Sequence, residues 1–224
     1  MKKIMNTWRE FLLEDTRAFH GYKMDPTKMR VKDCEQGEPS AENPSNQWTT
    51  GEKGCPRFTD DKDIDEEHED IVEALVFLEN VRPKTLIAYS RGGAVASAAL
   101  QKSQHKPEVK FVAPAWKRGW VKNNPIAPSG LKGSIVHGTR DNAVPLRHSF
   151  ELAKETGLPL YVAPEANHIN ILKLKDNPEK GLRVPPNIID LGLKQLPEWK
   201  NGTMGTEDQV ENQHQFISRL KNKK

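Results

Sequence analysis

Short apolar segments alternate with helix-like segments between residues 60 and 168, and this alternation restricts the fold more than any other feature of the sequence. Four apolar runs have the length of β-strands: 85–89, 109–113, 134–137 and 158–163. The helix-like segments are 60–80, 92–102 and 146–156. Strands and helices that alternate at this spacing are joined by right-handed crossovers into a parallel sheet. We therefore expect an α/β fold with a mostly parallel sheet and helices on both faces.

The regions on either side of this stretch are more polar. Residues 7–19 have the pattern of an amphipathic helix, and residues 24–59 have the Pro, Gly, Asn and Ser content of a long loop. Near the other end, Thr206 and Gln209 predict a capping box that opens a last helix over residues 207–220, in a surface extension or oligomer arm. We expect one globular domain in three parts: an N-terminal helix and loop extension (1–59), an α/β core (60–170) and a C-terminal extension with a terminal helix (171–224).

Charge and composition argue against several classes of protein. The 34 basic and 31 acidic residues nearly balance, whereas a nucleic-acid partner requires clustered basic residues. No apolar run approaches the roughly 18 residues of a membrane span. Charges at Arg9, Glu10 and Glu14 interrupt any signal-peptide core, so we expect a cytoplasmic location. Cys34 and Cys55 are expected to be reduced, and no metal or organic cofactor is predicted.

The strongest chemical signal is the segment 88–93, Ala-Tyr-Ser-Arg-Gly-Gly, at a strand-to-helix junction. A nucleophile elbow requires small residues two positions before and two after the nucleophile, because its turn is tight. Ala88 and Gly92 meet this requirement around Ser90. The alternative is that Ser90 is an ordinary N-cap residue of the following helix.

An acid and a base follow the third and fourth apolar runs. The third run leads through a turn of small residues to Asp141, and the fourth leads to His168. A serine hydroxyl is a weak nucleophile, so His168 is the candidate base for Ser90, and Asp141 is the candidate acid that fixes the His168 tautomer. Glu165 is a weaker candidate for the acid because it lies only three residues before His168. His137, at the end of the third run, is interpreted as structural.

These three segments resemble the elbow, acid loop and histidine loop of the α/β-hydrolase superfamily, in the order serine, acid, histidine that this fold uses. The segments that carry the resemblance are 88–93, 137–145 and 167–168, within a match over residues 60–170. Position 88 is Ala where Gly is commoner in the family. The N-terminal strands of the usual sheet are hard to find, so the resemblance implies a reduced α/β-hydrolase fold, with a catalytic triad of Ser90, Asp141 and His168.

The resemblance also implies an oxyanion hole. Its first donor is the backbone N–H of Arg91, the residue after the nucleophile. His20 and Gly21 resemble the His-Gly turn that carries the second donor in many members, which makes Tyr22 the second donor. An equally supported alternative is that Phe19 continues an N-terminal helix and that His20 and Gly21 form its C-cap.

Trp116 and Trp120 follow the second apolar run, where loops surround the ligand crevice of a parallel sheet. They are candidates for the wall of a substrate pocket, and the alternative is that they pack under the polar loops. The side chain of Arg91 either favours a negatively charged substrate or pairs with a structural acid.

Residues 1–14 resemble the short capsid-targeting segments of internal head proteins in large tailed phages, which end in an apolar-x-Glu cleavage site such as residues 12–14. The resemblance implies a capsid packaging partner, a location in the virion and a mature chain that begins at Asp15. An amphipathic docking helix of no special origin explains the pattern about as well.

Together these features predict a serine hydrolase that cleaves a small-molecule carboxylic ester through an acyl-enzyme on Ser90. The alternative is a non-catalytic virion or interaction protein on the same scaffold, because a fold alone does not establish a function.

Overall fold

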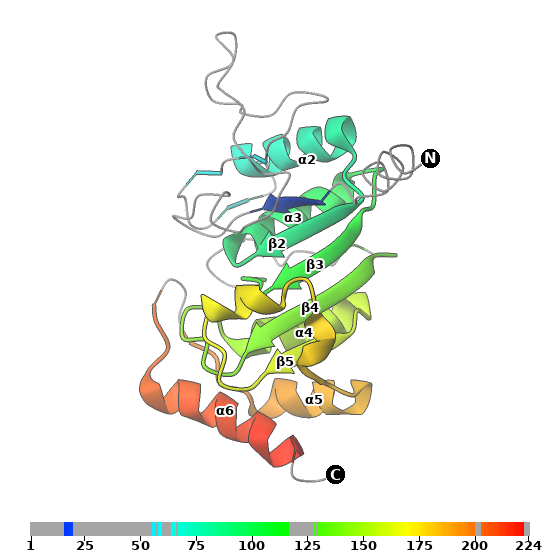
Figure 1. Cartoon of the computed structure of the whole chain (residues 1–224). Helices are drawn as coiled ribbons and strands as arrows, with labels where there is room; N and C mark the ends of the chain where they lie inside the picture. The colour runs from blue at the N-terminus through cyan, green and yellow to red at the C-terminus, as the bar shows by residue number, and fades with distance from the viewer. Residues whose placement is uncertain are drawn as a thin grey trace, which may run out of the picture.

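The computed structural model describes residues 16–19, 55–56, 58–59, 64–65, 67–116, 128, 130–199 and 203–221 (Figure 1). In the described residues, six strands form one sheet in the order β1-β2-β3-β4-β5-β6. The first five are parallel, and β6 is antiparallel to β5. The strands are β1 (Thr16–Phe19), β2 (Thr85–Tyr89), β3 (Glu108–Val112), β4 (Lys132–Gly138), β5 (Leu160–Ala163) and β6 (Leu182–Arg183).

The described α-helices are α2 (Glu69–Val81), α3 (Arg91–Lys102), α4 (Leu146–Thr156), α5 (Pro186–Gln195) and α6 (Glu207–Lys221). Two 3₁₀ helices, η3 (Asn170–Leu174) and η4 (Pro178–Lys180), lie between β5 and β6 in the chain. Within the described residues, no helix has the length and apolar character needed to cross a membrane.

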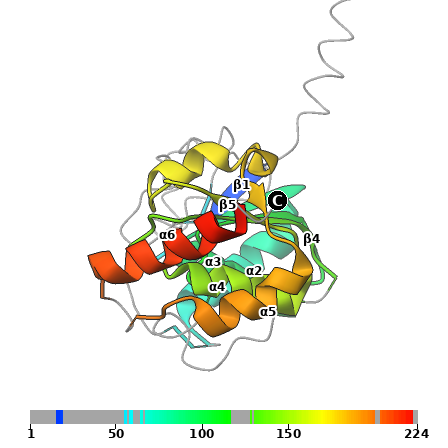
Figure 2. The same ribbon diagram turned by 90° about the horizontal axis from the view of Figure 1, so that it is seen from below.

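The predicted α/β fold with a mostly parallel sheet is confirmed. Successive strands step across the sheet in one direction, so right-handed crossovers place α2, α3 and α4 on the same face. Figure 2 shows these helices and α5 on one side of the sheet and η3 on the other. The second face is covered, among the described residues, by Ile171 of η3 and by Cys55.

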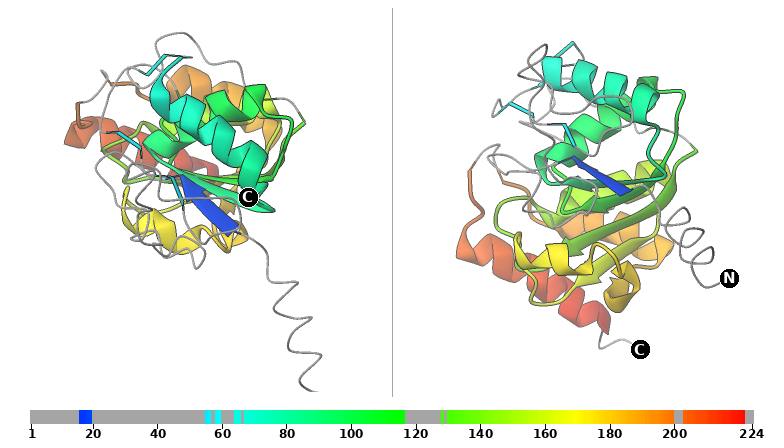
Figure 3. Two further views of the ribbon diagram at one scale, coloured as in Figure 1. Left: turned by 90° about the horizontal axis from the view of Figure 1, so that it is seen from above. Right: turned by 45° about the horizontal axis from the view of Figure 1, so that its top comes forward.

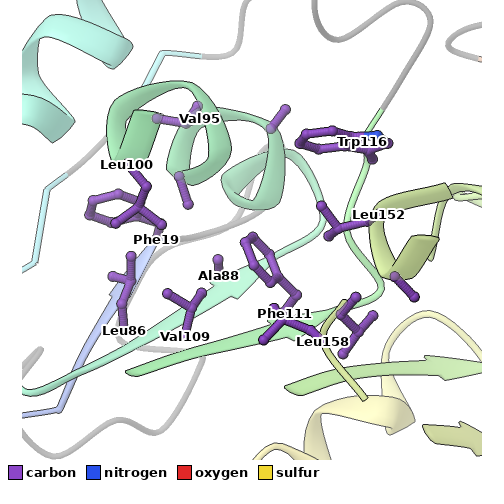
Figure 4. Packing of buried hydrophobic residues seen from close by; sticks show 14 of the residues in the cluster. Phe19, Leu86, Ala88, Val95, Leu100, Val109, Phe111, Trp116, Leu152 and Leu158 are labelled. Carbon is purple, nitrogen blue, oxygen red and sulfur yellow. The ribbon is translucent and has the colours of Figure 1, made fainter. Parts of the chain in front are cut away.

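The core lies between the sheet and the helices (Figure 4). Leu86 and Ala88 of β2 and Phe111 of β3 pack toward Val95 and Leu100 of α3, and all five side chains are fully buried. Burial of a large apolar side chain contributes roughly 1.5–3 kcal/mol. Side chains alternate between the two faces along a strand, and every residue of β2 is buried, so β2 is covered on both faces. Ser90 follows Tyr89 directly at the end of this strand.

The N-terminal prediction was wrong where the structure describes it. Residues 16–19 form β1, at the edge of the sheet, and not the end of a helix. Phe19 packs edge-to-face with Phe58 and Phe77, at centroid distances of 5.1 and 5.8 Å, and the N–H of Ala18 donates to Cys55 Sγ at 3.1 Å. Cys55 is disulfide-bonded, which contradicts the expected reduced state. The proposed targeting segment, residues 1–14, lies outside the described residues.

The helix predicted over residues 60–80 begins later, at Glu69. The ring of His68 accepts the N–H of Asp70 at 3.2 Å and so caps the helix at that point. Ile64, which the pattern placed on the helix, is fully buried ahead of it.

The C-terminal capping box is confirmed. The N–H of Thr206 donates to Gln209 Oε1 at 2.9 Å, and the N–H of Gln209 donates to Thr206 Oγ1 at 3.3 Å. The helix that follows, α6, packs through Phe216 against Phe150 of α4, with ring centroids 6.1 Å apart. Its inner face therefore belongs to the core, and the helix is not a free arm.

Candidate active site

Three polar side chains meet at the carboxyl edge of the sheet. Ser90 follows β2, Asp141 follows β4 and His168 follows β5. Parallel strands end at a common edge, where ligands of open α/β sheets bind. Ser90 Oγ lies 3.0 Å from His168 Nε2, and His168 Nδ1 lies 2.7 Å from Asp141 Oδ2. The structure thus brings the three predicted residues into one hydrogen-bonded chain.

Ser90 occupies a tight turn with φ 52° and ψ −122°. Its N–H donates to Val112 O, and its carbonyl accepts from the N–H groups of Gly93 and Ala115, at 2.9–3.0 Å. Such a conformation costs a non-glycine residue roughly 1–3 kcal/mol and persists only where surrounding contacts impose it. Ser90 occupies the N-cap position of α3, but its side chain makes no capping hydrogen bond, so it is not an ordinary capping serine. A Cβ on Gly93 would approach Pro114 Cβ to 2.7 Å, which explains the glycine there.

Asp141 is fully buried, and its two carboxylate oxygens have different partners. Oδ1 accepts the N–H groups of Ala143 and Val144, both at 2.9 Å, and this fixes the carboxylate. Oδ2 faces His168 and also lies 3.3 Å from His137 Nε2. Burial alone would raise the pKa of Asp141, but the charge of His168 and hydrogen bonds from both histidines outweigh it and hold the pKa below its usual value. Asp141 is therefore ionised at neutral pH.

His137 is structural, as expected, but its contact with Asp141 could not be predicted from sequence. Its Nδ1 lies 2.7 Å from Ser149 Oγ, and its Nε2 lies 3.1 Å from the carbonyl of Val144. Two acceptors, this carbonyl and the Asp141 carboxylate, face Nε2, so Nε2 carries the proton. A second imidazole N–H thus supports the buried carboxylate.

Tyr89 holds the backbone of the histidine loop. Its hydroxyl donates to the carbonyl of His168 at 2.8 Å, and the two rings lie 4.9 Å apart. Burial, and then the charge of Asp141, raise the pKa of Tyr89, so the hydroxyl stays protonated as a donor. The side chain of His168 is 17% exposed, so part of the imidazole reaches solvent.

Glu165, the alternative acid, points elsewhere. Its carboxylate lies 3.1 Å from both Arg140 Nε and His214 Nε2 and is 66% exposed. It does not contact the His168 ring, whose Nδ1 is occupied by Asp141.

The backbone of Arg91 occupies the position expected for an oxyanion donor. It is the first residue of α3, and the first N–H groups of a helix have no intrahelical acceptor. The predicted second donor, Tyr22, lies outside the described residues, as do His20 and Gly21. Because Phe19 is a strand residue, the alternative in which it continues a helix was wrong.

The side chain of Arg91 has a structural role. Its guanidinium forms a buried ion pair with Asp70, whose carboxylate also accepts the N–H and hydroxyl of Thr59 at 2.8 and 3.0 Å. The idea that Arg91 selects a negatively charged substrate is therefore wrong, and its alternative, a structural pair, is confirmed.

Trp116 belongs to the hydrophobic core. It is fully buried, and its backbone N–H donates to His148 Nδ1 at 3.2 Å. The prediction that it walls a substrate pocket was wrong, because no part of the side chain reaches solvent. Trp120 lies outside the described residues.

Gln213 is a residue that sequence reasoning missed. From α6, its Nε2 donates to the carbonyls of Thr139 and Asp141 at 3.0 and 2.8 Å, and its Oε1 accepts the N–H of Leu146 at 3.2 Å. One fully buried amide therefore clamps both ends of the loop that carries Asp141. No local pattern marks it, because its partners are about 70 residues away in the chain.

We expect Gln213→Leu to lower the free energy of unfolding by at least about 3 kcal/mol. The change leaves three buried backbone groups without partners, at roughly 1–3 kcal/mol each. Gln215→Leu changes an exposed residue of the same helix and should alter the free energy of unfolding by less than about 0.5 kcal/mol. Urea denaturation of both variants measures the difference, and equal stabilities would show that the clamp contributes nothing.

Within the described residues, no group of histidine, cysteine and carboxylate side chains is arranged to hold a metal ion. In comparisons with known proteins, no family model, no curated protein and no solved structure matches this chain.

Proposed function

We propose that this chain is a serine hydrolase of the α/β-hydrolase superfamily that cleaves a carboxylic ester through an acyl-enzyme on Ser90. The observation that carries the proposal is the hydrogen-bonded chain from Ser90 through His168 to the buried Asp141. A hydroxyl, an imidazole and a carboxylate in this order are the parts that activate a serine nucleophile.

In the proposed reaction, the Ser90 oxygen adds to the ester carbonyl carbon and its proton passes to His168 Nε2. The backbone N–H of Arg91 donates to the oxyanion that forms, and such donors are typically worth 10²–10³ in rate. His168 then gives the proton to the leaving alcohol as the carbon–oxygen bond breaks. A water molecule repeats the sequence on the acyl-enzyme, which releases the acid and restores Ser90.

Asp141 has two roles in this proposal. Its Oδ2 accepts from Nδ1 of His168, so the neutral ring presents an unprotonated Nε2 to Ser90. Once the ring takes the proton, the ionised carboxylate stabilises the imidazolium.

Hydrolysis of p-nitrophenyl acetate as a function of pH tests the proposal. We expect saturable turnover that falls in acid, because a protonated imidazole cannot accept the Ser90 proton. The lowered pKa of Asp141 keeps this carboxylate ionised at neutral pH. Turnover no faster than that of the heat-denatured chain, with acetate and longer acyl esters alike, would contradict the proposal.

A further inference from the structure

A groove of about 840 Å³ lies directly beside His168. It is bounded by the acid loop, by the histidine loop and by the start of α6, and Figure 3 shows the start of α6 and η3 near each other at the carboxyl edge of the sheet. Its volume falls within the range of about 300–1,000 Å³ that is typical of small-molecule sites. His168 contributes to its lining.

Two apolar side chains stand in this groove exposed to solvent. Ile169 is 72% exposed and Met204 is 61% exposed, the highest values among the large hydrophobic residues that the structure describes. The N–H of Ile169 donates to Asn167 Oδ1 at 3.1 Å, and the N–H of Gly205, the residue after Met204, donates to the carbonyl of Asn142 at 2.7 Å. Two exposed apolar side chains in the lining of one groove offer a surface for an apolar ligand.

The described residues that line the groove carry a net negative charge, because Glu207, Asp208 and Glu211 outnumber Arg140. The cation in its lining, Arg140, is neutralised by Glu165 and Glu211. Glu207 and Asp208, in the first turn of α6, are exposed and form no ion pair with any described residue. They favour a cation and disfavour an anion in the groove.

The position of His168 indicates which part of an ester the groove would receive. In acyl transfer the imidazole protonates the leaving group, so the leaving alcohol lies on the histidine side of the serine. We propose that this groove binds the alcohol portion of the substrate, and that this portion is an apolar chain with a cationic end. This inference rests on the proposed serine hydrolase function.

Three esters with the same acyl group test the inference. Butyrylcholine carries a quaternary ammonium, 3,3-dimethylbutyl butyrate is its neutral isostere, and ethyl butyrate lacks the groove-filling part. We expect kcat/KM to be highest for the choline ester, by about fivefold over the isostere at low salt, because exposed charges contribute modestly. The ratio should fall toward one near 0.5 M salt through screening. The isostere should exceed the ethyl ester because of its contacts with Ile169 and Met204.

Variants of the lining residues test whether these differences in kcat/KM arise in the groove. Glu207→Gln combined with Asp208→Asn should reduce the choline-to-isostere ratio to about one. Glu69→Gln, an exposed first-turn acid on α2, is the matched control and should leave the ratio unchanged. Ile169→Ser should lower the isostere-to-ethyl ratio, and its high exposure means that folding should not suffer.

The outcomes separate the groove from the chemistry. A wild-type choline-to-isostere ratio at or below one, or a ratio that the double variant does not change, overturns the groove assignment while the hydrolase proposal stands. Failure to cleave all three esters while Ser90 still reacts with a fluorophosphonate also overturns the groove assignment alone. Failure to cleave them together with an unreactive Ser90 overturns both.

Discussion

Replacing Ser90 with alanine is expected to reduce hydrolysis of short p-nitrophenyl esters by about 10⁴–10⁶, the usual effect of removing a member of such a triad. The change removes the atom that accepts the acyl group and leaves the imidazole without a hydroxyl to deprotonate. Folding should be preserved, because the Ser90 hydroxyl hydrogen-bonds to His168 and supports no backbone group. Steady-state kinetics and the thermal midpoint of both proteins check the two expectations.

Ser97→Ala is the matched control for this experiment. Ser97 lies on α3, seven residues from Ser90, is fully buried and donates to the carbonyl of Gly93 at 2.8 Å. Its loss should leave turnover within about tenfold of wild type, which is under about 1.4 kcal/mol of barrier. If Ser90→Ala keeps more than about a tenth of the wild-type rate on that scale, another residue is the nucleophile.

The second large effect is expected for Asp141→Asn, which should lower turnover by roughly 10⁴. An asparagine that keeps its oxygen on the N–H groups of Ala143 and Val144 must turn its NH₂ toward His168. Nδ1 of His168 then becomes the acceptor, the proton moves to Nε2, and the ring can no longer accept the Ser90 proton.

Glu165→Gln is the comparison that identifies the acid. Glu165 contacts Arg140 and His214 at the surface, so its change should alter turnover by less than about tenfold. Measurement of kcat for both variants over the pH range of the wild type decides between them. If Glu165→Gln lost most of its kcat while Asp141→Asn stayed near the wild-type value, the acid would be Glu165. The Ser90–His168 pair would remain in place.

The fold was predictable where local patterns carry it. The apolar runs that became β2, β3, β4 and β5 and the helices α3 and α4 were located to within about two residues, because each combines a periodic pattern with a clear start and end. The failure at β1 has a physical cause. Thr16–Phe19 is stabilised as a strand by its pairing with β2 and by the packing of Phe19 on Phe58 and Phe77, contacts 39 and 58 residues away in the chain.

In the candidate site, too, local patterns predicted some features, and others depend on contacts between distant parts of the chain. Ser90, Asp141 and His168 were predicted to meet because each follows a strand of one parallel sheet, and strand ends converge whatever the details of packing. The partner of Arg91, the burial of Trp116 and the Gln213 clamp depend on how distant elements pack, and no local signal encodes them. The groove beside His168 is likewise formed only when the start of α6 meets the acid loop.

Labelling with a fluorophosphonate probe, followed by peptide mass spectrometry, shows whether Ser90 is an activated nucleophile, since the probe modifies a serine only where a neighbouring base activates it. We predict a single adduct, on Ser90, that disappears in Ser90→Ala, remains in Ser97→Ala and forms far more slowly in His168→Ala. A folded chain with no adduct, or with its adduct on another residue, would contradict the account and favour a non-catalytic role for this scaffold.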